Sequence, residues 1–201
     1  MQNRIDGLLY VSYVGVTKNG VINELEKNGV PFACIIGGRD LPGVSCVDVS
    51  FFESGYLAVK HLAENNYKDI AYIHEAKPEN GPYAEKERFE GCIRAAEDYQ
   101  LKLEFDSAFV NISGEKELIK AAKDVLALNR YDSFISTSFN CHIILKSAAG
   151  LGIKVPRSLG VISLDNELYA PYLYPSLTTI DEPLFDIARR AASILLDKIQ
   201  G

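Results

Sequence analysis

The residues best suited to binding a polar ligand lie at two distant places in this chain. Arg88 opens the motif RFEG at 88–91, and Asp165 directly follows the apolar run 159–164. A guanidinium is a planar fork of donors that stays charged, and a carboxylate accepts hydrogen bonds from hydroxyl groups. Such a pair would suit a ligand rich in oxygen atoms. Each residue also has an ordinary explanation: Arg88 pairs with a nearby acid such as Glu85 or Glu90, and Asp165 caps a turn.

The elements that must position these residues follow the pattern of a parallel α/β fold. Short apolar runs alternate with stretches in which apolar residues recur at helical spacing, as is typical of βαβ units. The expected strands are 5–11, 31–36, 45–49, 69–74, 105–110, 133–137, 159–164 and 177–180. The expected helices are 19–28, 50–64, 85–99, one that starts at Ser113, 140–149 and 185–199. Because ligands bind just past the carboxyl ends of strands in such sheets, Asp165 stands at a ligand-facing position.

Composition limits the classes of protein to which the chain belongs. Its 201 residues are 47% hydrophobic and 24% charged, enough for one large or two small globular domains. A net charge of −6 without a cluster of basic residues argues against nucleic-acid binding by this polypeptide. No apolar run is long enough for a membrane span, and the first residues lack the layout of a signal peptide. We therefore expect a cytoplasmic protein that does not contact a membrane.

Residues that commonly hold metals or perform covalent chemistry are scattered. The cysteines at 34, 46, 92 and 141 form no CxxC motif, and the histidines at 61, 74 and 142 share no ligand spacing. We expect free cysteines in the core and neither metal nor cofactor. The chain has no GxSxG, P-loop or GxGxxG motif, and the run 37–40 is too short to cradle a phosphate. An enzymatic site built from Asp165, Asn166 and Glu167 is disfavoured because consecutive turn residues face different directions. The sequence thus predicts a protein that is not an enzyme.

A series of short motifs, in order, resembles the effector-binding core of the LacI/GalR-type bacterial transcriptional repressors. They are IDGLL at 5–9, VPFACII at 30–36, VSCVD at 44–48 with GYLAVKHL at 55–62, YKDIAYI at 67–73, RFEG at 88–91, GIKVP at 152–156, SLDN at 163–166 and PSLTTI at 175–180. Each motif is short and unspecific by itself. Their order and near-regular spacing over almost the whole chain carry the resemblance.

The resemblance implies an α/β fold with two Rossmann-like parallel-sheet subdomains joined by crossover strands, as in type I periplasmic binding proteins. On this basis residues 1–46 plus 179–201 form an incomplete N-terminal subdomain, and residues 47–178 form the C-terminal subdomain. Family members carry a helix-turn-helix headpiece before this core. We expect a core truncated at both ends, which would contact DNA only through a headpiece that this chain lacks.

The resemblance also implies a function. A small-molecule effector, expected to be a sugar or another small polar metabolite, would bind in the cleft between the subdomains and control a repressor that acts as a homodimer. The alternative from the same architecture is the solute-binding protein of a sugar transporter. The missing signal peptide and the unpaired cysteines favour the regulator over that alternative.

Roles for individual residues follow from the matched motifs. In the family, the arginine that Arg88 matches binds effector oxygens, and the aspartate that Asp165 matches accepts hydrogen bonds from sugar hydroxyls. The chain departs from the family motif AND at 136–138: Thr137 replaces the asparagine that contacts the effector, and Ser138 replaces the aspartate that caps the helix. Thr137 offers one hydroxyl in place of an amide, so a typical hexose is not implied.

Aromatic and acidic residues complete the predicted site. Tyr83 and Phe139, with Phe51 and Tyr169 as further candidates, could stack against the apolar face of a sugar ring. Aromatic residues at such places are more often core or rim residues than ligand platforms. Glu182 follows the last expected strand. It either faces the ligand or is solvated at the hinge.

Overall fold

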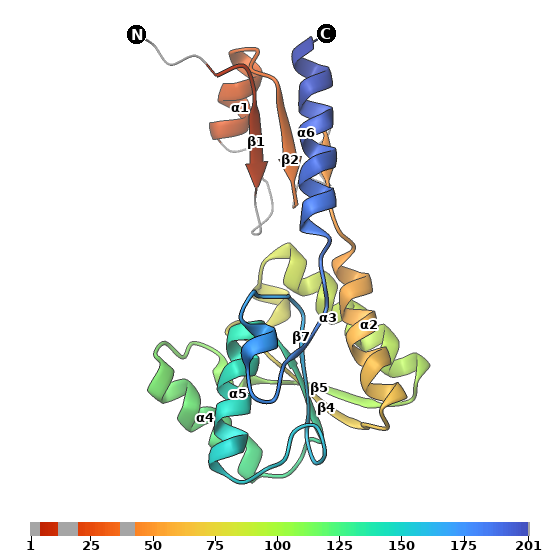
Figure 1. The fold of residues 1–201 in the computed structure, drawn as a ribbon, viewed down its shortest axis with the longest axis vertical. Coiled ribbons are helices and arrows are strands. Elements are labelled where there is room, and N and C mark those ends of the chain that lie inside the picture. The colour runs from red at the N-terminus through yellow and green to blue at the C-terminus, as the bar shows by residue number, and fades with distance from the viewer. Residues whose placement is uncertain (1–4, 12–19, 37–42, 201) are drawn as a thin grey trace. The chain divides into compact units, whose positions relative to one another are not determined.

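The computed structural model describes residues 5–11, 20–36 and 43–200. The chain divides into two compact units (Figure 1). One comprises Met1–Ser50, Pro82–Ala84 and Pro183–Gly201, and the other comprises Phe51–Gly81 and Glu85–Glu182. We call them unit 1 and unit 2. The boundaries of the two subdomains expected from the sequence stay a prediction.

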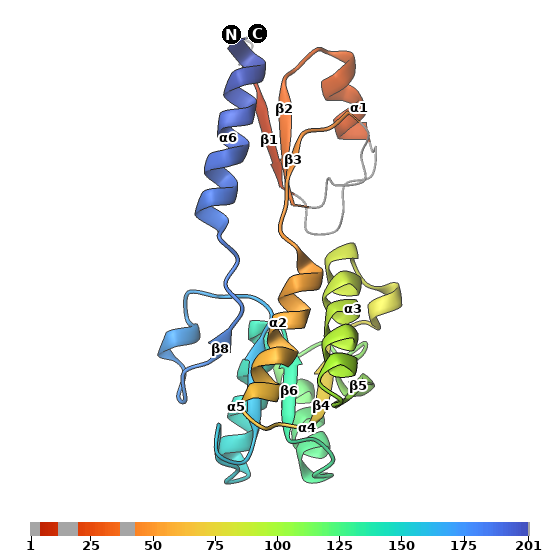
Figure 2. The same ribbon diagram turned by 90° about the vertical axis from the view of Figure 1, so that its right-hand side faces the viewer.

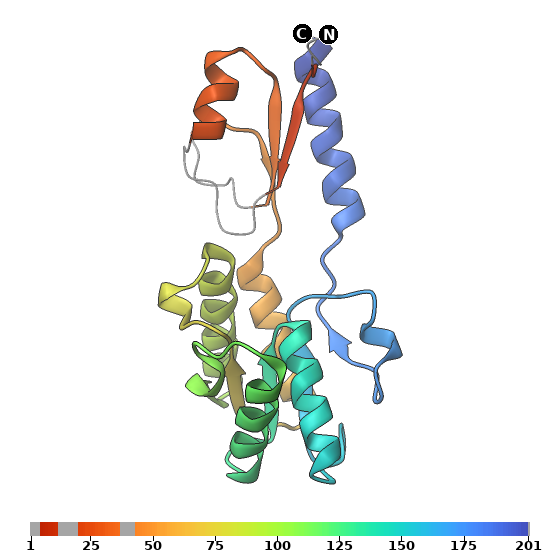
Figure 3. The same cartoon turned by 90° about the vertical axis from the view of Figure 1, so that its left-hand side faces the viewer.

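Unit 1 contains a three-stranded parallel sheet in the order β1-β2-β3. Its strands are β1 (Leu8–Val11), β2 (Phe32–Ile35) and β3 (Cys46–Val47), and its helices are α1 (Gly20–Lys27) and α6 (Leu184–Gln200). The two helices lie on opposite sides of the sheet (Figures 2 and 3). Ile22 of α1 packs on Phe32 and Cys34 of β2. Gly7 allows α6 to approach closely, since a Cβ atom there would lie 2.8 Å from Leu195 Cδ1.

Unit 2 contains a five-stranded parallel sheet in the order β5-β4-β6-β7-β8. Its strands are β4 (Asp69–Ile73), β5 (Lys102–Asp106), β6 (Ser133–Ser136), β7 (Gly160–Ser163) and β8 (Thr178–Thr179). Its helices are α2 (Phe51–Glu64), α3 (Tyr83–Asp98), of which the first two residues are assigned to unit 1, α4 (Glu115–Ala127) and α5 (Ser138–Gly150). The parallel α/β fold expected from the alternating pattern is therefore confirmed.

Helices cover both faces of the unit 2 sheet (Figure 1). Side chains on both faces of the central strands β4, β6 and β7 are therefore buried, whereas the edge strands β5 and β8 are more exposed. Because successive strand residues point to opposite faces, Ala71 and Ile73 pack with α4 and α5. Ile70 and Tyr72 of the same strand pack with α2 and α3. This double burial explains why the sequence shows these strands as continuous apolar runs.

Two glycines allow the backbones of α2 and α3 to touch. A Cβ atom on Gly55 would lie 1.8 Å from the carbonyl oxygen of Arg88, and one on Gly91 would lie 1.9 Å from that of Phe52. No other residue type fits at such a separation. The glycine of the RFEG motif therefore fixes where α3, and with it Arg88, lies against α2.

The structure corrects some local expectations. The expected strand 105–110 ends at Asp106, because the Asp106 side chain accepts a hydrogen bond from the Ala108 N–H (2.9 Å) and starts a 3-10 turn, η2 (Ser107–Phe109). Helical spacing of apolar residues predicts that Leu57 of α2 and Ile93 of α3 face the core, but they are 42% and 39% exposed. Within the described residues, no helix combines the length and apolar character that a membrane span needs.

Candidate functional site

Three of the predicted polar residues of unit 2 lie in segments that follow the carboxyl ends of its strands, whereas Arg88 lies in α3. Thr137 follows β6, Asp165 lies two residues after β7, and Glu182 lies three residues after β8. Since all five strands are parallel, their carboxyl ends meet at one edge of the sheet, where ligands bind in open α/β sheets. The run 37–40, considered above as a phosphate cradle, lies outside the described residues.

Arg88 forms a buried ion pair with Glu182. One guanidinium nitrogen, Nη2, lies 2.7 Å from Glu182 Oε1, and the two side chains are 10% and 9% exposed. The guanidinium lies over the ring of Phe51, with 4.9 Å between its central carbon and the ring centroid. The second guanidinium nitrogen lies 3.9 Å from Glu85 Oε2. Glu85 was expected from the sequence as a partner, whereas the stronger pairing with Glu182 was not.

A buried network extends from Glu85 to the end of β4. The Tyr72 hydroxyl donates a hydrogen bond to Glu85 Oε1. Burial, together with the charge of the Glu85 carboxylate, raises the pKa of Tyr72 well above 10.0, so this hydroxyl stays a donor. His74 Nε2 lies 3.4 Å from Glu85 Oε2 and 3.3 Å from Glu75 Oε2. The sequence analysis did not predict that Tyr72 and His74 belong to the site. Their position at the end of an apolar strand was the feature that could have indicated it.

Asp165 caps helix α5. Its Oδ1 atom accepts hydrogen bonds from the Ser138 N–H (2.6 Å) and from the Ser163 hydroxyl, while the Ser138 hydroxyl donates to the Asp165 carbonyl oxygen (3.0 Å). Ser138, which stands at the position of the family's capping aspartate, is the first residue of α5. Thr137 is the N-cap residue and makes no side-chain capping bond. The first turn of α5 has no acidic residue of its own, and the capping carboxylate is that of Asp165, which follows strand β7. The ligand-binding role of Asp165 stays a prediction.

The remaining candidates differ in accessibility. Thr137 and Tyr83 are partly buried, and Tyr83 is the first residue of α3. Phe139 is half exposed on the first turn of α5. Phe51 is fully buried beneath Arg88, and Tyr169 is partly exposed. The structure therefore brings together Arg88 and Glu182 among the predicted residues, and the ligand-binding roles of all six stay predictions.

Asp165 and the residue after it have separate partners. Asn166 donates a hydrogen bond to Asp181 Oδ1 (2.9 Å) and accepts one from the Thr179 hydroxyl (3.1 Å). These bonds tie the end of β7 to the end of β8. Across the described part of the chain, no three His, Cys, Asp or Glu side chains are grouped so that they could hold a metal ion.

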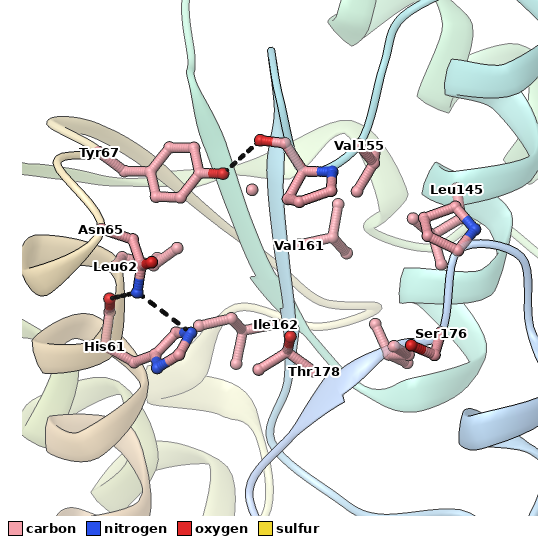
Figure 4. Close-up of a pocket in the computed structure, with 14 residues that line it drawn as sticks. His61, Leu62, Asn65, Tyr67, Leu145, Val155, Val161, Ile162, Ser176 and Thr178 are labelled. Atoms are coloured by element: carbon pink, nitrogen blue, oxygen red, sulfur yellow. Dashed lines mark hydrogen bonds between the residues drawn. The ribbon is translucent and has the colours of Figure 1, made fainter.

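A cavity of about 300 Å³ lies elsewhere in unit 2, beside the amino half of β7 (Figure 4). His61 of α2 lines one side and Leu145 of α5 lines the opposite side, with Ser176 and Thr178 below. The Tyr67 hydroxyl donates a hydrogen bond to the carbonyl oxygen of Pro156 across the upper rim (2.6 Å). None of the six predicted site residues lines this cavity, so it is separate from the predicted site.

Comparison with known proteins identifies the family. A sequence model described as a periplasmic binding protein-like domain matches residues 59–201. The chain belongs to this family. Among its relatives, the HTH-type transcriptional repressor PurR of Aliivibrio fischeri is 31% identical over 207 residues, which cover 99% of this chain and 59% of the repressor. The NTD biosynthesis operon regulator NtdR of Bacillus subtilis is 29% identical over 163 residues, 79% of this chain and 48% of the regulator.

Solved structures agree with this assignment of the periplasmic binding protein-like domain. A LacI family transcriptional regulator from Enterococcus faecium, solved with bound ribose, superimposes with a TM-score of 0.79 at 24% identity, over 96% of this chain and 71% of that chain. A LacI family regulatory protein from Chloroflexus aggregans gives a TM-score of 0.79 at 17% identity, over 98% of this chain and 70% of that chain. These likenesses show the fold.

The resemblance drawn from the motifs is thus confirmed: this periplasmic binding protein-like domain is an effector-binding core of the LacI type. The relatives named above are regulators, which favours that assignment over the transporter alternative. The chain spans 59% of the length of PurR and 48% of NtdR. The expected position of a ligand between two subdomains stays a prediction.

Proposed function

We propose that this chain is the effector-sensing core of a LacI-type transcriptional repressor and that its effector is a sugar or another small polar metabolite. The observation that carries the proposal is the buried guanidinium of Arg88, paired at 2.7 Å with Glu182 beyond the carboxyl end of β8. Ligands of open α/β sheets bind at this edge. The ribose bound to the Enterococcus faecium regulator supports a sugar as the class of effector.

Sensing requires no chemical step. An effector that binds one conformational state more tightly than another shifts the equilibrium between them, by an amount set by its difference in affinity. In a repressor that binds DNA through a headpiece, this shift would alter DNA binding. The residues of the site then serve to bind and orient the effector, and we propose no enzymatic activity for them.

We further propose that the core associates as a homodimer. The segment between β7 and β8 carries three large side chains that are almost wholly exposed: Leu168, Tyr172 and Tyr174. Exposed apolar and aromatic side chains close together on one loop commonly mark an association surface. Analytical ultracentrifugation tests this, and Tyr174→Asp is expected to shift the chain toward the monomer.

A reducing compartment, the cytoplasm, is the location that we propose. Cys34, Cys92 and Cys141 are buried and form no disulfide bond. Proteins of oxidising compartments commonly pair their cysteines in disulfides. Measuring the repressor's distribution by cell fractionation checks this.

The function is tested by measuring the melting temperature of the purified chain in the presence of sugars, sugar phosphates, purines and amino acids. A ligand that binds the folded state raises the melting temperature by mass action. Arg88→Lys keeps the charge and loses the planar fork of donors. We expect this variant to bind the compound at least tenfold more weakly, and the rise in melting temperature to be smaller. Arg94→Lys, an exposed position on the same helix that pairs with Asp98, is the matched control. A cooperative melt that no compound shifts would contradict the proposal.

A further inference from the structure

The guanidinium of Arg88 is already paired with an anionic group, the carboxylate of Glu182. Glu182 Oε1 lies 2.7 Å from Arg88 Nη2, and both side chains are about nine-tenths buried. A carboxylate at this distance from a guanidinium makes a strong, charge-assisted hydrogen bond. Glu182 therefore holds one of the donor positions that an effector carboxylate or phosphate would need.

The surrounding charges are also predominantly negative. Glu85, with its side chain 4% exposed, lies 3.9 Å from the other guanidinium nitrogen. Glu75 joins the cluster through His74, whose Nε2 lies 3.3 Å from Glu75 and 3.4 Å from Glu85. One planar face of the guanidinium lies against the ring of Phe51. Three carboxylates thus accompany one guanidinium and one imidazole.

Such an arrangement penalises an incoming anion in either of two ways. If the anion displaces Glu182, that carboxylate is left buried without its partner, which is strongly unfavourable. If the anion binds beside Glu182, like charges face each other in a poorly solvated place. A hydroxyl or an ammonium group meets neither penalty, because both can donate hydrogen bonds to the carboxylates.

One donor in the cluster still lacks an acceptor. The Nε–H group of Arg88 is buried and has no hydrogen-bond partner among the residues that the structure describes. A neutral oxygen, such as a ring or hydroxyl oxygen, would satisfy this donor without displacing Glu182. Specificity of this kind depends as much on what the site repels as on what it binds.

We infer that Glu182 occupies the anion position of Arg88, so that the effector presents hydroxyl or amine groups to this site and carboxylate or phosphate effectors are rejected. The inference rests on the proposed function and adds the charge class of the ligand. Glu182 acts through Arg88 and is therefore a residue that determines specificity.

Inorganic phosphate tests the inference without knowledge of the effector. The melting temperature of the wild-type chain and of Glu182→Gln is measured in sodium phosphate and in sodium chloride of equal ionic strength. Glutamine keeps an oxygen that accepts from Arg88 and removes the charge. We expect no phosphate-specific stabilisation of the wild type, and stabilisation of Glu182→Gln that Arg88→Lys abolishes in the double variant. Phosphate stabilisation of the wild type that Arg88→Lys removes would overturn the inference, as would a Glu182→Gln variant that folds and gains none.

A panel of sugars matched in ring structure separates this inference from the proposed function. Glucose, glucosamine, glucuronate and glucose 6-phosphate, and ribose with ribose 5-phosphate, are titrated into the wild type, Glu182→Gln and the control Glu97→Gln, which changes an exposed acid on α3. We expect binding confined to neutral and amino sugars in the wild type, and at least a tenfold gain in affinity for the anionic sugars in Glu182→Gln alone. Preferential wild-type binding of an anionic sugar overturns the inference and leaves sensing intact. Wild-type rejection of phosphate together with no binding of any sugar counts against a sugar effector and leaves the assignment of Glu182 standing.

Discussion

The carboxylate of Asp165 accepts a hydrogen bond from the backbone N–H of Ser138 at 2.6 Å. The two residues belong to different elements: Asp165 follows β7, and Ser138 is the first residue of α5. The first N–H groups of a helix have no partner within the helix, so a carboxylate at this position stabilises both the N–H groups and the helix dipole. Asp165 thus links the carboxyl edge of the sheet to the start of a helix that covers it.

Replacing Asp165 is therefore expected to reduce stability before it affects any ligand. Asp165→Ala leaves the Ser138 N–H and the Ser163 hydroxyl without their acceptor and should lower the free energy of unfolding by about 1–2 kcal/mol, the usual cost of losing a helix cap. Asp165→Asn keeps one oxygen at this position and should lose less. Urea denaturation monitored by circular dichroism measures the free energy of unfolding of both variants. Equal stability of the alanine variant and the wild type would show that the cap contributes nothing.

Gly91 is expected to tolerate no side chain. In Gly91→Ala the new Cβ atom would lie 1.9 Å from the Phe52 carbonyl oxygen, so α2 and α3 must move apart. Overpacking of this severity costs roughly 3 kcal/mol or more. The matched control is Gly150→Ala at the end of α5, where the nearest atom to the added Cβ is 3.8 Å away on Lys123, and where stability should be unchanged or higher. The melting temperatures of the two variants test this prediction. A Gly91→Ala protein as stable as the control would contradict the close contact between the backbones of α2 and α3.

Asn140 offers a change that is expected to stabilise the protein. Its side chain is fully buried, and neither its amide nitrogen nor its oxygen has a hydrogen-bond partner within the described residues. A buried polar group without a partner costs about 1–3 kcal/mol, and leucine has a similar shape without that cost. Asn140→Leu should therefore raise the free energy of unfolding by about 1 kcal/mol or more in chemical denaturation. Asn140→Ala, which removes the amide and leaves a cavity, should gain less. A loss of stability in the leucine variant would indicate that the amide has a partner.

Stability is expected to fall in alkaline solution. Burial, and secondarily the neighbouring Cys46, raise the pKa of the Cys34 thiol from 9.0 to about 11, although Lys198 lowers it in part. Burial also raises the pKa values of Cys92 and Cys141 well above 9.0. Above pH 9 the unfolded chain therefore binds fewer protons than the folded chain, so the free energy of unfolding decreases as the pH rises.

This pH dependence is measured by urea denaturation at pH 7, 8, 9 and 10. The free energy of unfolding should be nearly constant from pH 7 to 8 and should decrease from pH 9 to 10. Cys34→Ala removes one of the thiols and should make the decrease less steep. A stability that is unchanged or rises over the upper interval would show that the buried thiols ionise as readily as those of the unfolded chain.

Much of the local structure could be predicted from the sequence. Apolar runs bounded by polar turns identify strands such as Gly160–Ser163, and helical spacing of Leu118, Ala122, Val125 and Leu126 identifies the buried face of α4. These signals are local, since they depend on which faces of an element are buried. The order of the short motifs likewise indicated the family. The end of β5 at Asp106 was mispredicted because a single side-chain hydrogen bond to Ala108 decides it.

The sequence by itself determined the parallel α/β class and the candidate side chains, Arg88, Asp165 and Glu182 among them. Only the tertiary structure decided with which groups these side chains pair. Arg88 and Glu182 are 94 residues apart in the chain, and Asp165 and Ser138 are 27 apart. Their meeting depends on the strand order β5-β4-β6-β7-β8 and on the close contact of α2 and α3 at Gly55 and Gly91. Strand order and helix packing arise from the sum of many distant contacts, so no spacing within a short motif encodes them.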